Sequence, residues 1–230
     1  MHTRRLERSL GGGSSIDEDE LPLLGRIKPD RRWMVLRWNA NFSTYLEPIF
    51  ASLLPGRVER TGRAHELVFR FRGQEAFDNR LIPQEEMIAG GLYTVRGYPQ
   101  AALAGDSVTV SSVEYKFHLP RILGVRRQTV KLPLLGDFRL ARQHAAGRPD
   151  WDLVLSTFVD LGTVRQSQKR NGEIQSSLFG AGVGAELQIR ENISLRYNLG
   201  VALHELENIV GGDIAGRGDF EHHLEFSVLY

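Results

Sequence analysis

The sequence predicts an all-β protein built from antiparallel strands. Seven segments alternate apolar and polar residues with a period of two, as a strand does when its two faces meet different media. Each is close to the length that a tilted transmembrane strand needs, about 9–11 residues. The segments are residues 33–42, 65–73, 107–118, 151–161, 177–189, 193–204 and 220–230.

A soluble β-sandwich would show the same alternation, but two features favour a transmembrane β-barrel. The polar faces carry charges of both signs, as the wall of a water-filled lumen does. The connections also differ by side, because residues 190–192 form a tight turn whereas 162–176 and 205–219 are long and rich in Gly and charge. We therefore expect residues 31–230 to be the C-terminal portion of an antiparallel transmembrane β-barrel, with about seven strands.

The first thirty residues do not continue this pattern. Residues 1–30 are polar, rich in Gly and Ser, and then acidic, so we predict a disordered or loop segment. They contain no apolar stretch of the kind that a signal peptide requires. An exported barrel without an export signal is contradictory, so we expect a fragment of a longer protein or a truncated gene model.

Composition excludes several function classes. The net charge of +1 gives no electrostatic case for nucleic acid. The absence of cysteine excludes disulfides and thiolate metal sites, and no apolar run is long enough for a transmembrane helix. No motif places a nucleophile beside a base, so we predict neither an enzyme nor a cofactor.

Residues 90–106 interrupt the strand pattern with a loop. The stretch contains four glycines, a proline and the run Val95-Arg96-Gly97-Tyr98, and it leads directly into the strand at 107–118. Counting strands back from the tight turn places this loop on the side of the long loops. The motifs Gly-Gly, Thr-Val-Arg-Gly-Tyr, Gly-Asp and Ser-x-Glu-Tyr follow one another here.

These motifs resemble the pore-loop region of outer-membrane protein-transport barrels, in particular the two-partner secretion transporters of the hemolysin activator/secretion type (ShlB/FhaC/HecB). The resemblance covers residues 33–230 and extends to Phe158-Val159-Asp160-Leu161-Gly162, which matches a Phe-x-Asp-x-Gly pattern on an inner-wall strand of that family. It implies a barrel of about sixteen strands, of which these would be the last. The wider superfamily includes barrel assembly and insertion factors of the BamA/TamA type.

The resemblance implies that Arg96 reaches into the lumen and pairs with Asp160. Strand parity supports this independently, because Asp160 falls on the polar face of its segment. An arginine–carboxylate pair in a confined site is strong and specific in orientation, so we expect it to hold the loop inside the pore as a latch. An exposed turn arginine, which contributes little, is the alternative.

Other inward residues have two interpretations each. Gly180, Gly182 and Gly184 either leave room for the loop against the wall or help the strand twist. The Gly-x-Gly-x-x-Ala spacing there is not a dinucleotide site, because no βαβ pattern surrounds it. Glu114 either anchors the loop or is an ordinary lumen charge.

Three further features complete the prediction. His222 and His223 point to opposite faces of a strand, so we predict no metal site there. The last strand ends on Tyr230 and resembles the signal by which the barrel-assembly machinery binds its clients. The connection 119–150 is unusually long for a turn, and residues 132–146 are expected to hold a short amphipathic helix.

The sequence therefore predicts a bacterial outer-membrane pore of two-partner secretion type. Its expected partners are a large secreted protein (TpsA-like), outer-membrane lipid and the barrel-assembly machinery. The alternative is an assembly factor that inserts other barrels, since both groups carry a Val-Arg-Gly-aromatic loop.

Overall fold

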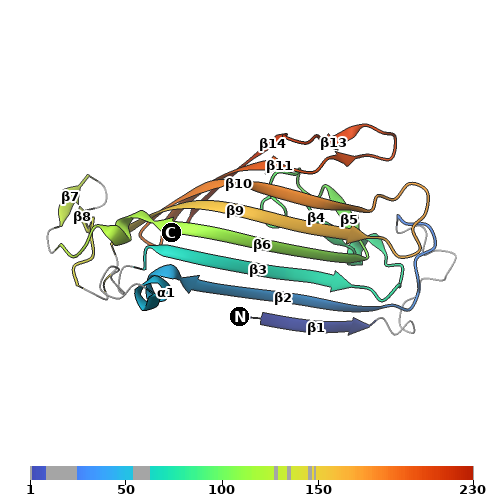
Figure 1. The fold of residues 1–230 in the computed structure, drawn as a ribbon, viewed down its shortest axis with the longest axis horizontal. Coiled ribbons are helices and arrows are strands. Elements are labelled where there is room, and N and C mark those ends of the chain that lie inside the picture. The colour runs from blue at the N-terminus through green and yellow to red at the C-terminus, as the bar shows by residue number, and fades with distance from the viewer. Residues whose placement is uncertain are drawn as a thin grey trace.

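The computed structural model describes residues 2–8, 25–53, 63–126, 129–133, 136–144, 147 and 149–229. Eight strands form one antiparallel sheet in the order β1-β2-β3-β6-β9-β10-β11-β14 (Figure 1). These strands are β1 (His2–Arg8), β2 (Met34–Tyr45), β3 (His65–Glu75), β6 (Ser107–His118), β9 (Trp151–Arg165), β10 (Ser176–Ile189), β11 (Ile193–Ala202) and β14 (Phe220–Val228). The predicted all-β antiparallel fold is confirmed.

The connections are of two kinds. At the end of the sheet where β10 turns into β11, here called the turn end, lie the helix α1 (Leu46–Leu53), the 3-10 helix η3 (Leu119–Ile122) and the hairpin β7 (Val130–Leu132) with β8 (Gly136–Phe138). At the opposite, loop end lie η2 (Pro83–Glu85) and two small hairpins, β4 (Met87–Ala89) with β5 (Leu103–Gly105) and β12 (Leu206–Glu207) with β13 (Asp213–Ala215). None of the described helices is long and apolar enough to cross a membrane.

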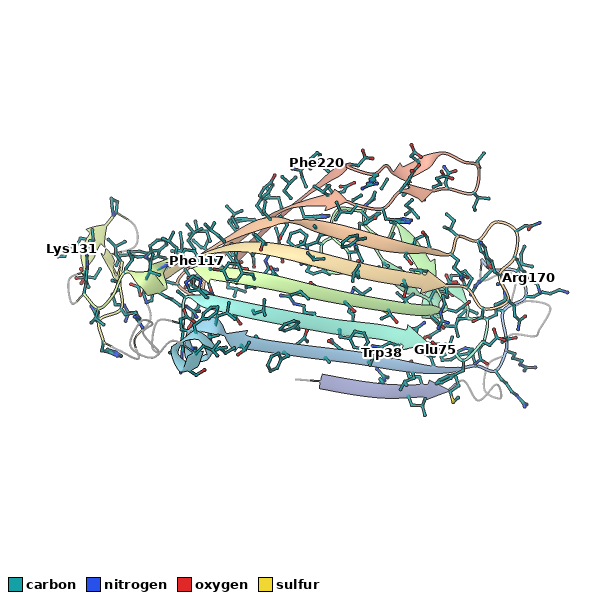
Figure 2. All side chains as sticks on the ribbon, viewed as in Figure 1. Trp38, Glu75, Phe117, Lys131, Arg170 and Phe220 are labelled. Carbon is teal, nitrogen blue, oxygen red and sulfur yellow. The ribbon has the colours of Figure 1, made fainter. Side chains whose placement is uncertain are left out.

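The two faces of the sheet differ sharply in chemistry. The outer face of the eight-stranded sheet carries two charged residues between Met34 and Val228, Glu75 and Arg165. They pair with each other at 2.8 Å near the loop end. Figure 2 shows the large side chains that stand out from the sheet. Apolar side chains that are at least one-third exposed on this face are Leu6, Met34, Phe42, Phe69, Phe71, Val113, Leu155, Val159, Leu161, Phe179, Val183, Leu195, Tyr197, Phe220, Leu224, Phe226 and Val228.

The inner face carries the charged residues and the buried core. Cross-strand partners such as Ser112 and Asp160, or Asp160 and Gly180, share this face because side chains alternate along each strand. The core on this face combines loop residues with inward residues of β6, β9, β10 and β11: Ala89, Val95, Tyr98, Leu103, Val108, Val110, Val164, Leu178, Ala202, Leu206 and Ala215. The core therefore lies between the wall and an inserted segment.

Two predictions about the connections were wrong. His2–Arg8, which we placed in a disordered or loop segment, forms β1, because its backbone pairs with β2 from Arg8–Met34 to His2–Ala40 and needs no apolar side chains to do so. The helix expected at 132–146 is replaced by the β7–β8 hairpin. Pro133 lacks the N–H that a helix interior needs, and Gly136 adopts a positive φ of 68°.

Candidate functional site: a loop held against the inner wall

The inserted loop, residues 90–106, connects β4 to β6 and lies on the inner face. The strand β5 near the end of the loop pairs with β4, which precedes the loop, with Met87 opposite Gly105, and this pairing brings the two ends of the loop together. Gly90, Gly91 and Gly97 have φ values of 106°, 94° and 99°, which side chains other than glycine rarely adopt. The glycines thus allow a compact turn that directs Arg96 toward the wall.

Arg96 and Asp160 are brought together at the inner wall. The Arg96 Nε donates to Asp160 Oδ2 at 2.7 Å and its NH2 group donates to Oδ1 at 2.9 Å. The Arg96 backbone N–H adds a third hydrogen bond to Oδ2 at 3.0 Å. Asp160 is 0% exposed and Arg96 is 6% exposed, so this bidentate pair is shielded from water, where it is strongest. We call the Arg96–Asp160 contact the lumen latch.

Neighbouring side chains orient the Arg96 guanidinium. It stacks on the ring of Phe158, with Cζ 3.4 Å from the ring centroid, and donates to Ser112 Oγ at 3.3 Å. Glu114 lies 3.5 Å from its NH1 and also accepts a hydrogen bond from Arg70 at 2.5 Å. Glu114 thus contacts the loop arginine and a wall arginine, which favours the anchoring interpretation over that of an isolated lumen charge.

Val95 and Tyr98 fix the loop on either side of Arg96, and both are completely buried. The Tyr98 hydroxyl donates to the His204 carbonyl at 2.6 Å and accepts from the Phe179 N–H at 3.1 Å. Tyr98 therefore ties the loop to the ends of two strands by backbone hydrogen bonds. This contact is additional to the ion pair, since it uses β10 and the segment after β11.

Glycines on the wall provide the space that the loop occupies. A Cβ atom on Gly180 would clash with the Arg96 carbonyl oxygen, and one on Gly162 would lie 2.7 Å from Val95 Cγ2. A Cβ on Gly182 would meet Phe158 and the β11 backbone, and one on Gly184 would lie 2.6–2.7 Å from side-chain oxygens of the wall. The interpretation that a missing side chain leaves room for the loop therefore fits Gly180 and Gly162. The space at Gly182 and Gly184 is taken up by other wall residues and not by the loop.

A second charged cluster lies at the loop end, just below the base of the inserted loop. Arg26 pairs with Asp106 through two hydrogen bonds of 2.6 and 2.9 Å, and its Nε contacts Glu173 at 3.0 Å. Arg80 donates two further hydrogen bonds to Glu173, at 2.5 and 2.9 Å. We call these four residues the loop-end clasp. They join four segments that lie far apart in the sequence.

Asp106 is the centre of the loop-end clasp. It is 0% exposed, and its two carboxylate oxygens also accept hydrogen bonds from the backbone N–H groups of Leu81 and Ser167 at 2.8 and 2.7 Å.

Burial opposes ionisation of Glu173, but the hydrogen bonds from Arg80, Arg170 and Arg26 outweigh it and lower the pKa of Glu173 to about 2. Glu173 is therefore ionised at neutral pH, as its two arginine partners require.

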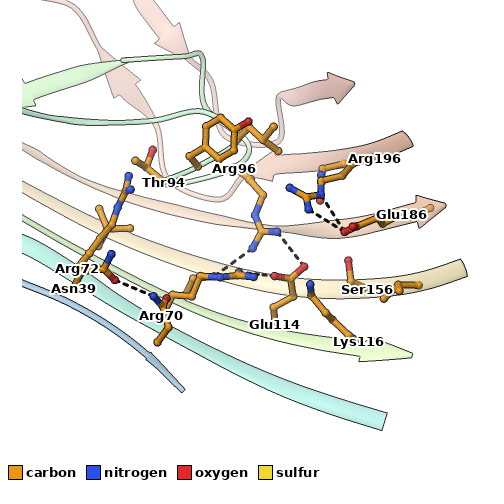
Figure 3. Close-up of a pocket in the computed structure, with 18 residues that line it drawn as sticks. Asn39, Arg70, Arg72, Thr94, Arg96, Glu114, Lys116, Ser156, Glu186 and Arg196 are labelled. Carbon is orange, nitrogen blue, oxygen red and sulfur yellow. Dashed lines mark hydrogen bonds and ion pairs between the residues drawn. The ribbon is translucent and has the colours of Figure 1, made fainter. Parts of the chain in front are cut away.

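A cavity of about 230 Å³ separates the inserted loop from the rest of the wall (Figure 3). It is lined by Leu92, Tyr93, Thr94 and Arg96 of the loop and by inward residues of β2, β3, β6, β9, β10 and β11. The latter include Arg70, Arg72, Lys116, Arg196 and Asn198. Most lining side chains are polar, as expected of a wall that faces water.

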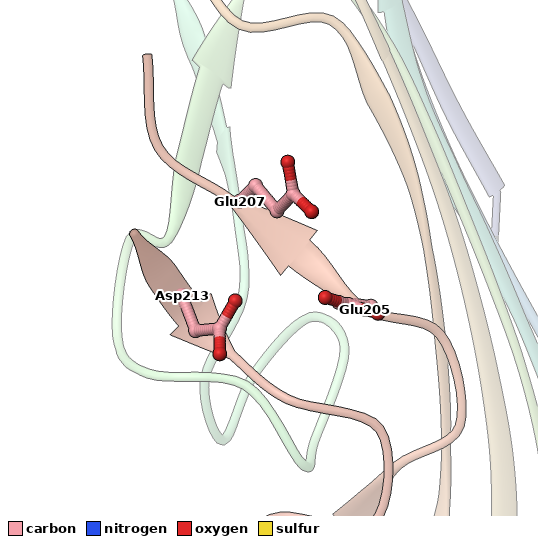
Figure 4. Close-up of side chains that lie close together, drawn as sticks. All are labelled: Glu205, Glu207 and Asp213. Carbon is pink, nitrogen blue, oxygen red and sulfur yellow. The ribbon is translucent and has the colours of Figure 1, made fainter. Parts of the chain in front are cut away.

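Two other groups of polar residues lie apart from the inserted loop. Glu205, Glu207 and Asp213 gather at the β12–β13 hairpin, with one carboxylate oxygen of each within 4.8 Å of the others (Figure 4). All three are exposed, and exposed acidic groups of this kind are common without an ion. His222 contacts the Tyr197 hydroxyl on the outer face at 2.7 Å, whereas His223 faces inward across from Asn198.

Sequence reasoning missed the loop-end clasp. Asp106 belongs to the Gly-Asp motif of the loop, but we gave it no role. Arg26, Arg80 and Glu173 lie in connections without periodic patterning, so nothing in the sequence indicated that they meet. The signal available was chemical: a carboxylate at the base of an inserted loop needs partners once it is buried, and the connections are rich in arginine.

The fold and site define a class of architecture: part of an antiparallel barrel wall, apolar outside and charged inside, with a loop inserted along the inner face. Among solved structures the chain is similar to CdiB from Escherichia coli, a two-partner secretion transporter, with a TM-score of 0.56 and 13% identity. The match covers 99% of this chain and 33% of CdiB, so the chain spans about a third of that protein. At this identity the likeness shows the fold. No family model and no curated protein matches the sequence.

Proposed function

We propose that the chain forms the C-terminal part of an outer-membrane barrel that exports a large secreted protein in the manner of a two-partner secretion transporter. The outer face supports a location in lipid, because between Met34 and Val228 its apolar side chains are exposed and its two charged residues, Glu75 and Arg165, lie near the loop end. The fold of CdiB supports the transport class. The secreted protein would pass along the inner face, which is lined with charged and polar side chains.

The barrel in this proposal needs more strands than the eight described. Within the described sheet, β1 and β14 each pair on one side, and open edges in lipid leave backbone groups without partners. Further strands of a longer protein or of another chain would close the wall. The terminal strand would bind the barrel-assembly machinery during insertion, although Tyr230 itself lies outside the described residues.

The lumen latch carries the mechanistic part of the proposal. With Arg96 on Asp160, the inserted loop fills the lumen beside β6, β9 and β10, so export requires the loop to leave. Breaking a buried ion pair costs about 3–5 kcal/mol, and every 1.4 kcal/mol changes an equilibrium tenfold. Loss of the lumen latch should therefore raise the ratio of released to inserted loop by at least about a hundredfold.

The experiment replaces each member of the lumen latch in the protein reconstituted in a planar lipid bilayer. We expect Arg96→Ala and Asp160→Ala to change the mean conductance and the frequency of open events, and to lower secretion of the partner protein. Both variants should still assemble in the outer membrane, because the orphaned group regains water once the loop leaves. Arg139→Ala is the control, since this arginine pairs with Asp150 at the turn end, away from the inserted loop.

The result separates the two function classes. Unaltered conductance and secretion in both latch variants, with Arg139→Ala unchanged as well, would exclude the lumen latch. If the variants instead lower the insertion of other outer-membrane barrels while conductance and secretion stay normal, the protein is an assembly factor and the transport proposal fails.

A further inference from the structure

The cavity between the inserted loop and the wall contains cations that its own carboxylates do not neutralise. Within it, Arg70 shares Glu114 with Arg96, and Arg196 pairs with Glu186 at 3.0 Å. Arg72 and Lys116 line the same cavity, and neither makes a hydrogen bond or a close ion pair with the described residues, although the charge of Lys116 interacts with the Glu114 carboxylate that Arg70 and Arg96 already share. Figure 3 shows both among the side chains that surround the space.

The position of Arg72 is energetically unfavourable, because one of its nitrogen atoms is buried without a hydrogen-bond partner. Its Nε is fully shielded from solvent and has no hydrogen-bond partner among the described residues. A buried donor without a partner costs about 1–3 kcal/mol, and more when it is charged. An arginine that faces a cavity in this condition is suited to an anion that enters from outside the chain.

Two buried neutral side chains around the same cavity also lack partners. Thr94, on the loop, is 7% exposed, and its hydroxyl oxygen makes no hydrogen bond within the described part of the chain. Asn198, on β11, is 3% exposed, and its Nδ2 amide group is likewise unpaired. Both residues line the cavity, so a polar group bound there would satisfy donors on the loop and on the wall together.

We propose that this cavity binds a carboxylate carried by an acidic side chain of the polypeptide that passes through the barrel. This inference rests on the proposed transport function. The ligand is anionic because Arg72 has no partner and Lys116 has only a share of Glu114, and a carboxylate matches the planar donor pair of a guanidinium. The volume of about 230 Å³ is below the range of about 300–1,000 Å³ typical of drug-sized ligands, and it suits one side chain of an extended segment.

The test measures peptide binding directly and does not depend on export. The full-length protein in detergent micelles is titrated against a fluorescently labelled oligoglutamate peptide, with oligoglutamine of equal length as the uncharged probe, and anisotropy is recorded. We expect oligoglutamate to bind and oligoglutamine not to bind. Arg72→Gln and Lys116→Gln should each weaken oligoglutamate binding about tenfold, the effect of losing one charge-assisted hydrogen bond.

Controls decide whether the cavity and a polypeptide are involved. Arg139→Gln, which removes an arginine paired with Asp150 at the turn end, should leave binding unchanged. All variants are first checked for the heat-dependent gel mobility of a folded barrel, and Lys116→Gln provides the test if Arg72→Gln fails to fold. Equal binding by Arg72→Gln, Lys116→Gln and the parent protein would overturn the proposal.

A competition experiment shows whether the site requires a carboxylate on a polypeptide or accepts any small carboxylate. Acetate is added at the carboxylate concentration of the peptide. Retention of the peptide supports a polypeptide site, whereas complete displacement would show a small-anion site and overturn the proposal. The failure of this test is distinguishable from failure of the transport function, because conductance and secretion of the Arg96→Ala variant are measured separately.

Discussion

Two arginine–carboxylate contacts hold the segment between β3 and β6, and they differ in how many parts of the chain they join. The lumen latch links one loop residue, Arg96, to one wall residue, Asp160. The loop-end clasp links four segments through Arg26, Arg80, Asp106 and Glu173. The chemistry is the same in both, but the loop-end clasp joins four segments of the chain, whereas the lumen latch joins two.

The two contacts hold different parts of the inserted loop. The loop-end clasp fixes the base of the inserted loop to the rim of the sheet, where Asp106 directly precedes β6. The lumen latch positions the tip, at the far end of a turn that glycines make compact. Under the proposed function, the tip would leave the lumen while the loop-end clasp keeps the base of the loop in place.

The largest effect is expected from Asp106→Asn. The amide group would face the Arg26 guanidinium and two backbone donors, so a buried cation loses its main partner at a cost of about 3–5 kcal/mol. We expect a marked fall in the temperature at which the folded barrel unfolds, measured by gel mobility after heating. Asp213→Asn is the control, because Asp213 is exposed. Equal unfolding temperatures for the two variants would remove the distinction between clasp and latch.

A smaller effect on stability, but a clear one on the pore, is expected from Gly180→Ala. The new Cβ would clash with the Arg96 carbonyl oxygen, so the loop must shift although Arg96 and Asp160 are both present. Conductance should change in the same direction as in Arg96→Ala. The matched variant Gly184→Ala meets first the side-chain ends of Asn198 and Ser156, which can move. If both variants conduct like the parent protein, the loop does not rest on Gly180.

The contact between Arg96 and Asp160 could be predicted because the resemblance to the transporter family implied the pairing. Asp160 could be placed on the inward face by strand parity, and the motif around Arg96 marked the loop. The bidentate geometry, the Phe158 stacking and the role of Tyr98 depend on three-dimensional contacts across strands that parity does not fix. The alternation of side chains along a strand shows which face of the sheet a residue lies on. It does not show which residue of another segment that side chain contacts.

The loop-end clasp could not be predicted from the sequence, and the reason is physical. Its members lie in connections, whose paths depend on tertiary contacts and not on periodicity. Arg26 belongs to a segment that we predicted as disordered or loop, and Glu173 lies in the long loop between β9 and β10. The expected helix at 132–146 failed in the same way, since a short apolar run can be helix or strand until its breakers, here Pro133 and Gly136, are weighed.

The smallest predicted effect concerns pH. The pKa of Glu173 is lowered from its ordinary value of 4.5 to about 2, so Glu173 stabilises the fold fully above pH 4.5. That contribution is lost as the pH falls from 4.5 toward about 2. The unfolding temperature of Glu173→Gln should thus lie below that of the parent protein at neutral pH and approach it near the lowered pKa. Glu207→Gln, at an exposed site, serves as the control. A constant difference across this pH range would contradict the assignment.

The most direct test of the central claim, that the loop tip lies against the β9 wall and is held there by Arg96, uses a cysteine pair. The chain contains no cysteine, so Val95→Cys with Gly162→Cys introduces a unique pair, and a Cβ atom on Gly162 would lie 2.7 Å from Val95 Cγ2. Cγ2 is one bond from Val95 Cβ, and Val95 Cβ itself is farther from that position than the three nearest atoms, the last of which is at 3.9 Å. The two Cβ atoms therefore fall in the range of about 3.5–4.5 Å that a disulfide needs. We predict that the disulfide forms in high yield under mild oxidation and abolishes opening, and that Arg96→Ala lowers the yield. No disulfide, or an equal yield with and without Arg96, would contradict the account.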